Sequence, residues 1–193
     1  MKNMFSRREA LRLSAAAAIM GALPACTVID GKNTTTLVLN VAKIRAYAQA
    51  GLNAASTILS IPPVAAALGV GVAAAISAAS EGVSAALSAF EAEAGDQVTI
   101  VYNSDSLKTK VDALLTELEK LSESLAKALT SVSTELDDKT RADVTTALDA
   151  LRTIVAIFEA LLSGTIAVGA ACGRAKGPSM TEAQALATLH VTA

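Results

Sequence analysis

Residues 107–132 read LKTKVDALLTELEKLSESLAKALTSV, and this stretch decides the fold class. Apolar residues recur in it at alternating steps of four and three, the spacing that keeps side chains on one face of a helix packed against other helices. The members of this seam are Leu107, Val111, Leu114, Leu118, Leu121, Leu125, Ala128 and Val132, with Leu115, Leu129 and Leu136 widening it. Residues 107–132 therefore predict a long amphipathic helix with one buried face.

Three more segments carry apolar residues at helical spacing. A first helix is expected from Leu37 to the Pro62-Pro63 pair, with a seam at positions 37, 41, 44, 48, 51, 55 and 58. A second follows from Pro63 to about Ala94, before Gly95. The last begins after the acidic and hydroxyl residues of 137–143 and has a seam at positions 144, 148, 151, 155, 158 and 162. Together the four segments predict an all-α fold, an antiparallel four-helix bundle.

Two shorter features accompany the four helices. Gln97 to Tyr102 is rich in β-branched residues and predicts a short strand or an extended crossover between two helical hairpins, with no second convincing strand. Ser179-x-x-Glu182 has the spacing of a capping box and predicts a short C-terminal helix to about Leu189. The apolar run that follows Gly164 is a candidate extension of the fourth helix.

The first 25 residues have the composition of a secretory signal. A basic head is followed by the small-residue, weakly apolar run 13–22 and by Leu23-Pro24-Ala25-Cys26. The Arg7-Arg8 pair, with Leu11 three residues beyond it, resembles the twin-arginine export signal of bacteria. The resemblance implies export of a folded protein, to which the quick-forming local contacts of a helical bundle are suited.

Residues 23–26 resemble a lipobox, in which the cysteine is lipidated and becomes the new N-terminus. The resemblance implies that Cys26 carries the lipid and that the domain faces the periplasm, anchored to the outer membrane in a diderm cell. The expected division is a signal peptide (1–25), a lipidated tether (26–36) and a helical domain (37–193). The alternative is an ordinary cleaved signal with a cysteine at this place by chance.

The composition of the chain after residue 25 narrows the classes of function. Residues 26–193 number 168, enough for one domain, and carry 12 basic and 17 acidic side chains. An excess of acidic residues disfavours nucleic acid as a partner. Aromatic residues are scarce and much of the apolar content is alanine, which predicts close helix packing and little cavity volume.

An uncharged stretch separates Arg45 from Glu81. Its last part, 64–80, holds eight alanines and two glycines in seventeen residues. Such a segment fits either a membrane-inserting hairpin or a helix buried on all sides of a bundle. Seventeen residues is at the short limit for a span and alanine contributes little to insertion, so we expect the buried helix.

Residues capable of catalysis or of metal binding are few. No Glu-x-x-His pair exists for a di-metal bundle site, and His190 is three residues from the C-terminus. Glu159, in the apolar stretch 153–172, lies outside the helical seam and is expected to face solvent. Cys172 is expected to be a small buried hydrophobic residue. The alternative is a disulfide bond with Cys26, which can form only if Cys26 is not lipidated. We therefore expect no enzyme, no cofactor and no metal.

These observations favour a non-enzymatic envelope lipoprotein that presents one helical face, or the 97–102 crossover, to an unknown envelope partner. The seam of 107–132 with its flank is a face that could also support self-association. One alternative is a pore-forming or membrane-perturbing protein that uses residues 57–80. Another is a carrier that holds an apolar ligand between its helices.

Overall fold

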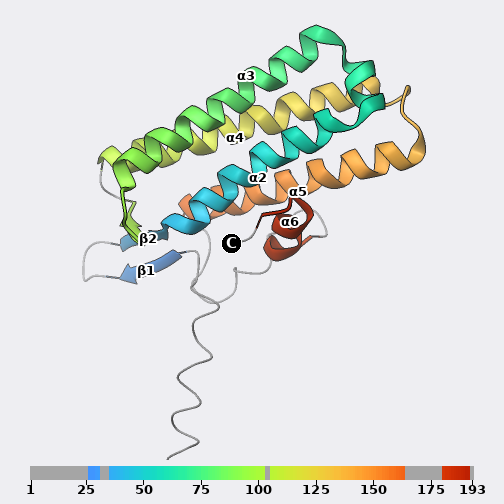
Figure 1. The fold of residues 1–193 in the computed structure, drawn as a ribbon. Helices are drawn as coiled ribbons and strands as arrows, with labels where there is room; N and C mark the ends of the chain where they lie inside the picture. Colours follow the sequence, from blue (N-terminus) through green and yellow to red (C-terminus); the bar gives the residue numbers. More distant parts are fainter. Residues whose placement is uncertain (1–25, 31–34, 103–104, 164–179, 192–193) are drawn as a thin grey trace, which may run out of the picture.

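The computed structural model describes residues 26–30, 35–102, 105–163 and 180–191. In this part of the chain five helices and three short strands follow one another (Figure 1). Their bounds are β1 (Cys26–Asp30), β2 (Thr35–Asn40), α2 (Val41–Ser60), α3 (Pro62–Ala94), β3 (Thr99–Val101), α4 (Asp105–Val132), α5 (Asp138–Leu162) and α6 (Glu182–Thr188). The prediction of a mainly helical protein is confirmed.

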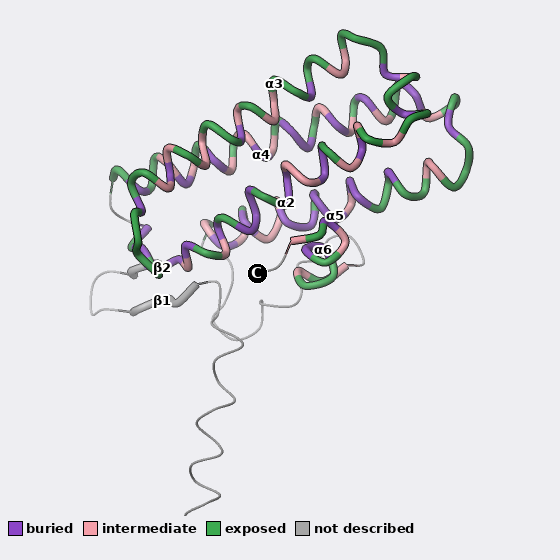
Figure 2. Tube along the Cα trace, in the orientation of Figure 1, coloured by how far each residue is buried: buried purple, intermediate pink, exposed green. Residues whose placement is uncertain are grey.

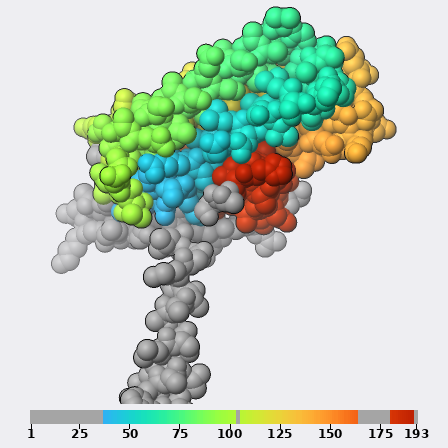
Figure 3. Space-filling model, viewed as in Figure 1, coloured from blue at the N-terminus to red at the C-terminus, as the bar shows by residue number. Residues whose placement is uncertain are grey.

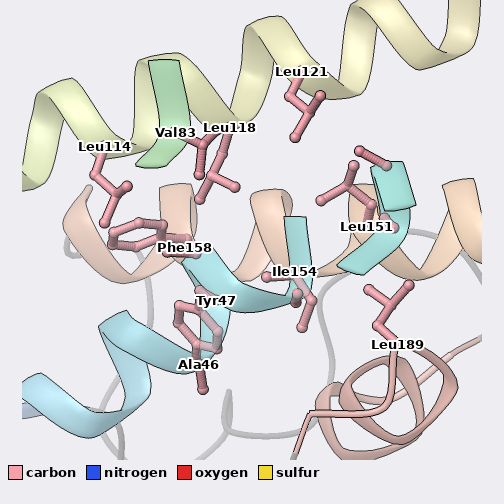
Figure 4. Close-up of a cluster of buried hydrophobic side chains, with 14 of the residues drawn as sticks. Ala46, Tyr47, Val83, Leu114, Leu118, Leu121, Leu151, Ile154, Phe158 and Leu189 are labelled. Atoms are coloured by element: carbon pink, nitrogen blue, oxygen red, sulfur yellow. The ribbon is translucent and has the colours of Figure 1, made fainter. Parts of the chain in front are cut away.

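The four long helices lie side by side, and the small sheet lies at one end of them (Figure 1). α2 contacts α3, α4 and α5, while α4 contacts both α3 and α5. The short helix α6 packs on α5 and α2. One continuous hydrophobic core lies between these elements, and Figure 4 shows the part where α2, α3, α4, α5 and the residue after α6 meet.

The apolar seam of 107–132 is buried along its whole length, from Leu107 to Val132. Leu136 is also buried, whereas Leu115 and Leu129 are partly buried against the core. The 4-3 spacing thus identified the inward face of α4 correctly. Because this face is occupied by the other helices of the same chain, it is not available for the self-association that the sequence suggested.

The predicted lone strand is part of a three-stranded antiparallel sheet with the order β1-β2-β3. The prediction that the first helix begins at Leu37 is wrong, because Leu37 and Leu39 lie in β2 and are buried at alternate positions. α2 begins at Val41, where the Asn40 side chain accepts a hydrogen bond from the Lys43 amide. The predicted tether, 26–36, contains β1 and the first residues of β2.

Helix α3 differs from the prediction in two ways. Gly69 has φ 66° and ψ 166°, so the helix is kinked there into a short first part and a long second part. The prediction of a helix buried on all sides is also wrong: Val64, Leu68 and Ile76 are buried, but most other residues of 62–80 are exposed (Figure 2). Alanine and glycine cover the outward side because α3 packs on its neighbours through one face only.

The caps of the last two helices are defined by side chains. Asp137 caps α5 by accepting from the Thr140 amide. The capping box of α6 joins Thr181 and Gln184, two residues later than the predicted pair of Ser179 and Glu182. Several predictions lie outside the described residues: the export signal at Arg7, Arg8 and Leu11, the extension after Gly164, Ser179, and Cys172.

Candidate functional site

The predicted lipidation site, Cys26, is the first residue of β1. Its backbone pairs with that of Leu39, one residue before the cap of α2. Two further backbone bonds surround this strand: the amide of Val41, the first residue of α2, donates to Val98 O just before β3 (3.0 Å), and the Tyr102 amide just after β3 donates to Leu37 O of β2 (2.9 Å). The segment that follows Cys26 is therefore held on β2, the strand that leads into α2.

A polar cluster fastens the sheet to α4. The hydroxyl of Tyr102 donates to Asp112 Oδ1, and Lys108 Nζ, which also pairs with Asp112, lies 5.1 Å from the centre of the Tyr102 ring. Burial, together with the hydrogen bond to Asp112, raises the pKa of Tyr102. A neutral phenol, a carboxylate and an ammonium in contact hold β3 on the first turns of α4.

The uncharged stretch forms the opposite end of the molecule, where α2 meets α3. We call residues 62–80 the tip, and its position is seen at the end of the helices away from the sheet (Figures 1 and 3). The tip carries no charged side chain, and Val70, the residue after the kink, is 89% exposed. Its other exposed residues are small or cyclic: Pro62, Pro63, Ala65, Ala66, Gly69, Gly71, Ala74, Ala75, Ser77 and Ala78.

The tip has the composition of a membrane segment but not the burial of a core helix. Among the described residues, α3 is the single helix long and apolar enough to cross a membrane, and 17% of its most apolar 18-residue window is buried. Apolar surface that is exposed to water and contiguous is a common property of interaction sites. Small side chains also let another backbone approach closely.

Residues suited to catalysis or metal binding are not gathered in the described part of the chain. No group of three or more His, Cys, Asp or Glu side chains there is arranged to hold a metal ion. Glu159 is exposed, as predicted, and His190 is exposed just beyond α6. The two features of interest are thus the Cys26 end and the tip.

Comparisons of the chain with family models, with curated proteins and with solved structures find no match. Sequence reasoning had singled out both Cys26 and residues 57–80, but it had not expected the tip to be exposed. The proline pair at its start and Gly69 within it signal the break before α3 and the kink inside it, because each interrupts a continuous helix.

Proposed function

We propose that the chain is a non-enzymatic lipoprotein of the bacterial envelope, exported by the twin-arginine route and anchored through Cys26. Its four long helices form an antiparallel four-helix bundle that faces the periplasm and acts as a binding or scaffolding module. The anchoring membrane is the outer membrane in a diderm cell. The export pattern at Arg7, Arg8 and Leu11 and the lipobox before Cys26 support the anchor, and the exposed tip supports binding.

The observation that carries this proposal is the placement of Cys26 and the tip at opposite ends of α2 (Figure 1). A lipid on Cys26 would lie beside the sheet, since β1 pairs directly with the strand that leads into α2. The 20 residues of α2 then separate the anchor from the tip by about 30 Å, at ~1.5 Å per residue. An anchored domain would thus present its uncharged surface away from its own membrane.

The chemistry of the tip favours a protein partner with a complementary apolar surface. Binding would remove the exposed Val70 and the neighbouring alanines from water without burying any charge of the tip. Backbones could approach closely there because the side chains are small. Because of the kink at Gly69, the two parts of α3 do not form one straight helix, so the surface of the tip is broader than one face of a single helix.

The test combines lipidation with contact at the tip in intact cells. Wild-type chain should incorporate labelled palmitate and fractionate with membranes, whereas Cys26→Ser should do neither. A photo-crosslinking residue at Val70 should give one adduct of defined mass, and the same residue at Lys127, exposed on α4, should not. Absence of palmitate would overturn the anchor, and equal adducts at both positions would overturn the tip as the binding surface.

The membrane-perturbing alternative keeps one observation in its favour, the length and composition of α3. In the observed conformation, however, the kink at Gly69 leaves residues 70–80 as the uncharged straight part, which spans about 16 Å of the ~30 Å hydrocarbon core. Dye release from phosphatidylethanolamine–phosphatidylglycerol vesicles, lost in Val70→Asp, would support insertion. Intact vesicles at high protein concentration would eliminate it.

A further inference from the structure

Helix α6 occupies a groove between α2 and α5 through one face. In Figure 3 α6 lies against both helices, although it is far from α2 in the sequence. Its buried residues Ala185 and Leu186, with Leu189 just after it, follow Glu182 at steps of three, four and seven. This i, i+3, i+4, i+7 pattern is the one by which an amphipathic helix is recognised in a groove.

The groove supplies a matching contact for each part of that face. Glu182 Oε1 accepts from Lys43 Nζ at 3.0 Å and from the Tyr47 hydroxyl at 2.9 Å. At the other end, Asn53 Nδ2 donates to Leu189 O at 2.9 Å. Figure 4 shows the Leu189 side chain directed toward Leu151 and Ile154 of α5. Polar contacts at both ends fix the register of α6, while the leucines fill the space between them.

The chain that leads to α6 is long for this contact. Nineteen residues, 163–181, separate the last residue of α5 from the first of α6. A chain of that length can span up to about 60 Å when extended. Its length therefore does not restrict α6 to the groove of its own chain, and the groove of a neighbouring copy offers the same set of contacts.

We infer that the groove between α2 and α5 is a helix-binding site whose partner is the α6 of a second copy, so that two chains dimerise by exchanging this helix. A second copy fits this groove because its α6 carries the same carboxylate, leucines and terminal carbonyl that the chain's own α6 places there. Exchange preserves all of these contacts and costs only association. Exchange should dominate where the local concentration of chains exceeds the intramolecular effective concentration, on the order of millimolar.

Reversing the charges at the Lys43–Glu182 pair tests this directly in the full-length chain. Lys43→Glu places two carboxylates together, and Glu182→Lys places two ammonium groups together, so neither chain should dock its own α6 well. Mixed, each chain provides the helix that the other groove requires. We expect a one-to-one heterodimer by native mass spectrometry, with a dissociation constant about tenfold lower than that of either variant alone.

The double variant K43E/E182K is the matched control, because it restores the opposite charges within one chain and should behave as wild type. Monomers in the mixture, or homodimers of the single variants as abundant as the heterodimer, overturn the exchange. If circular dichroism shows that a single variant has lost its helices, the wild-type chain decides. The fraction of wild-type chain that is dimeric should increase as the protein concentration is raised to about 1 mM, and Leu186→Asp should abolish this dimer. A wild-type chain that stays monomeric at every concentration overturns the inference.

Discussion

Gly51 of α2 and Leu118 of α4 are so close that a side chain on the glycine is excluded: a Cβ there would lie 2.4 Å from Leu118 Cδ2. Leu121 and Leu151 close the same space at 3.6 and 3.8 Å. Leu118 is fully buried, so its side chain has little room to move. The glycine sets the distance at which α2 and α4 pack.

Gly51→Ala should therefore destabilise the protein despite the better helix propensity of alanine. We expect the free energy of unfolding in urea to fall by roughly 1–3 kcal/mol, because the added methyl group forces buried leucines out of their rotamers. Gly71→Ala is the matched control, since no atom lies within 4 Å of the new Cβ. That variant should gain about 0.5–1 kcal/mol, and equal effects at the two sites would contradict the packing argument.

Gly69→Ala tests the kink in α3 through the backbone alone. No atom lies within 4 Å of a Cβ at this position either, but its φ of 66° is one that side chains rarely adopt. A loss of roughly 1–2 kcal/mol in the free energy of unfolding is expected. Stability equal to that of Gly71→Ala would show that the kink is not required.

The spacing of apolar residues was sufficient to predict the four long helices and the inward face of α4. The seam from Val41 to Ile58 was also read correctly, since every predicted member in α2 is buried. Such seams are local, and each can be recognised within one segment. The position at which a strand ends and a helix begins is less visible: Leu37 fitted the helical seam, although Leu37 and Leu39 also alternate as a half-buried strand does.

The sheet could not be recognised from any one segment. A strand as short as β3 gains stability only from its partners, and β2 lies about 60 residues before it in the chain. The exposure of the tip was missed for a different reason: alanine removes little surface from water when buried, so an alanine-rich helix does not require burial on all sides. The Glu182 contact with Lys43 and Tyr47 joins residues more than 130 positions apart and had no local signal.

Arg141 holds the turn between α4 and α5. Its Nε donates to Ser133 O at 3.0 Å and its Nη2 donates to Leu136 O at 2.8 Å, so one guanidinium satisfies two carbonyls near the end of α4. Arg141→Ala should lower the free energy of unfolding by roughly 1–2 kcal/mol. The control Arg152→Ala, on the same helix, removes one exposed ion pair with Asp149 at 3.7 Å and should change it by less than about 0.5 kcal/mol. Equal losses would argue against a role of the carbonyl contacts.

The N-cap of α5 should make stability depend on pH in the acidic range. The Thr140 amide donates to Asp137 Oδ1 at 3.0 Å and the Thr140 hydroxyl donates to Oδ2 at 2.7 Å. These hydrogen bonds to the charged form lower the pKa of Asp137 below its usual 3.8. Because the folded state holds this carboxylate charged, the contribution is fully present above the unfolded pKa and is lost as the pH falls through the folded value.

Comparison with Asp137→Asn isolates this contribution, because asparagine also caps a helix but does not titrate. Wild type should be the more stable protein at pH 7 by urea denaturation, and its advantage should shrink as the pH is lowered below about 4. Thr140→Val keeps the amide donor but deletes the hydroxyl, so its pH dependence in this range should be weaker than that of wild type. An advantage over Asp137→Asn that stays constant from pH 7 to about pH 2.5 would show that the cap does not depend on the charge of Asp137.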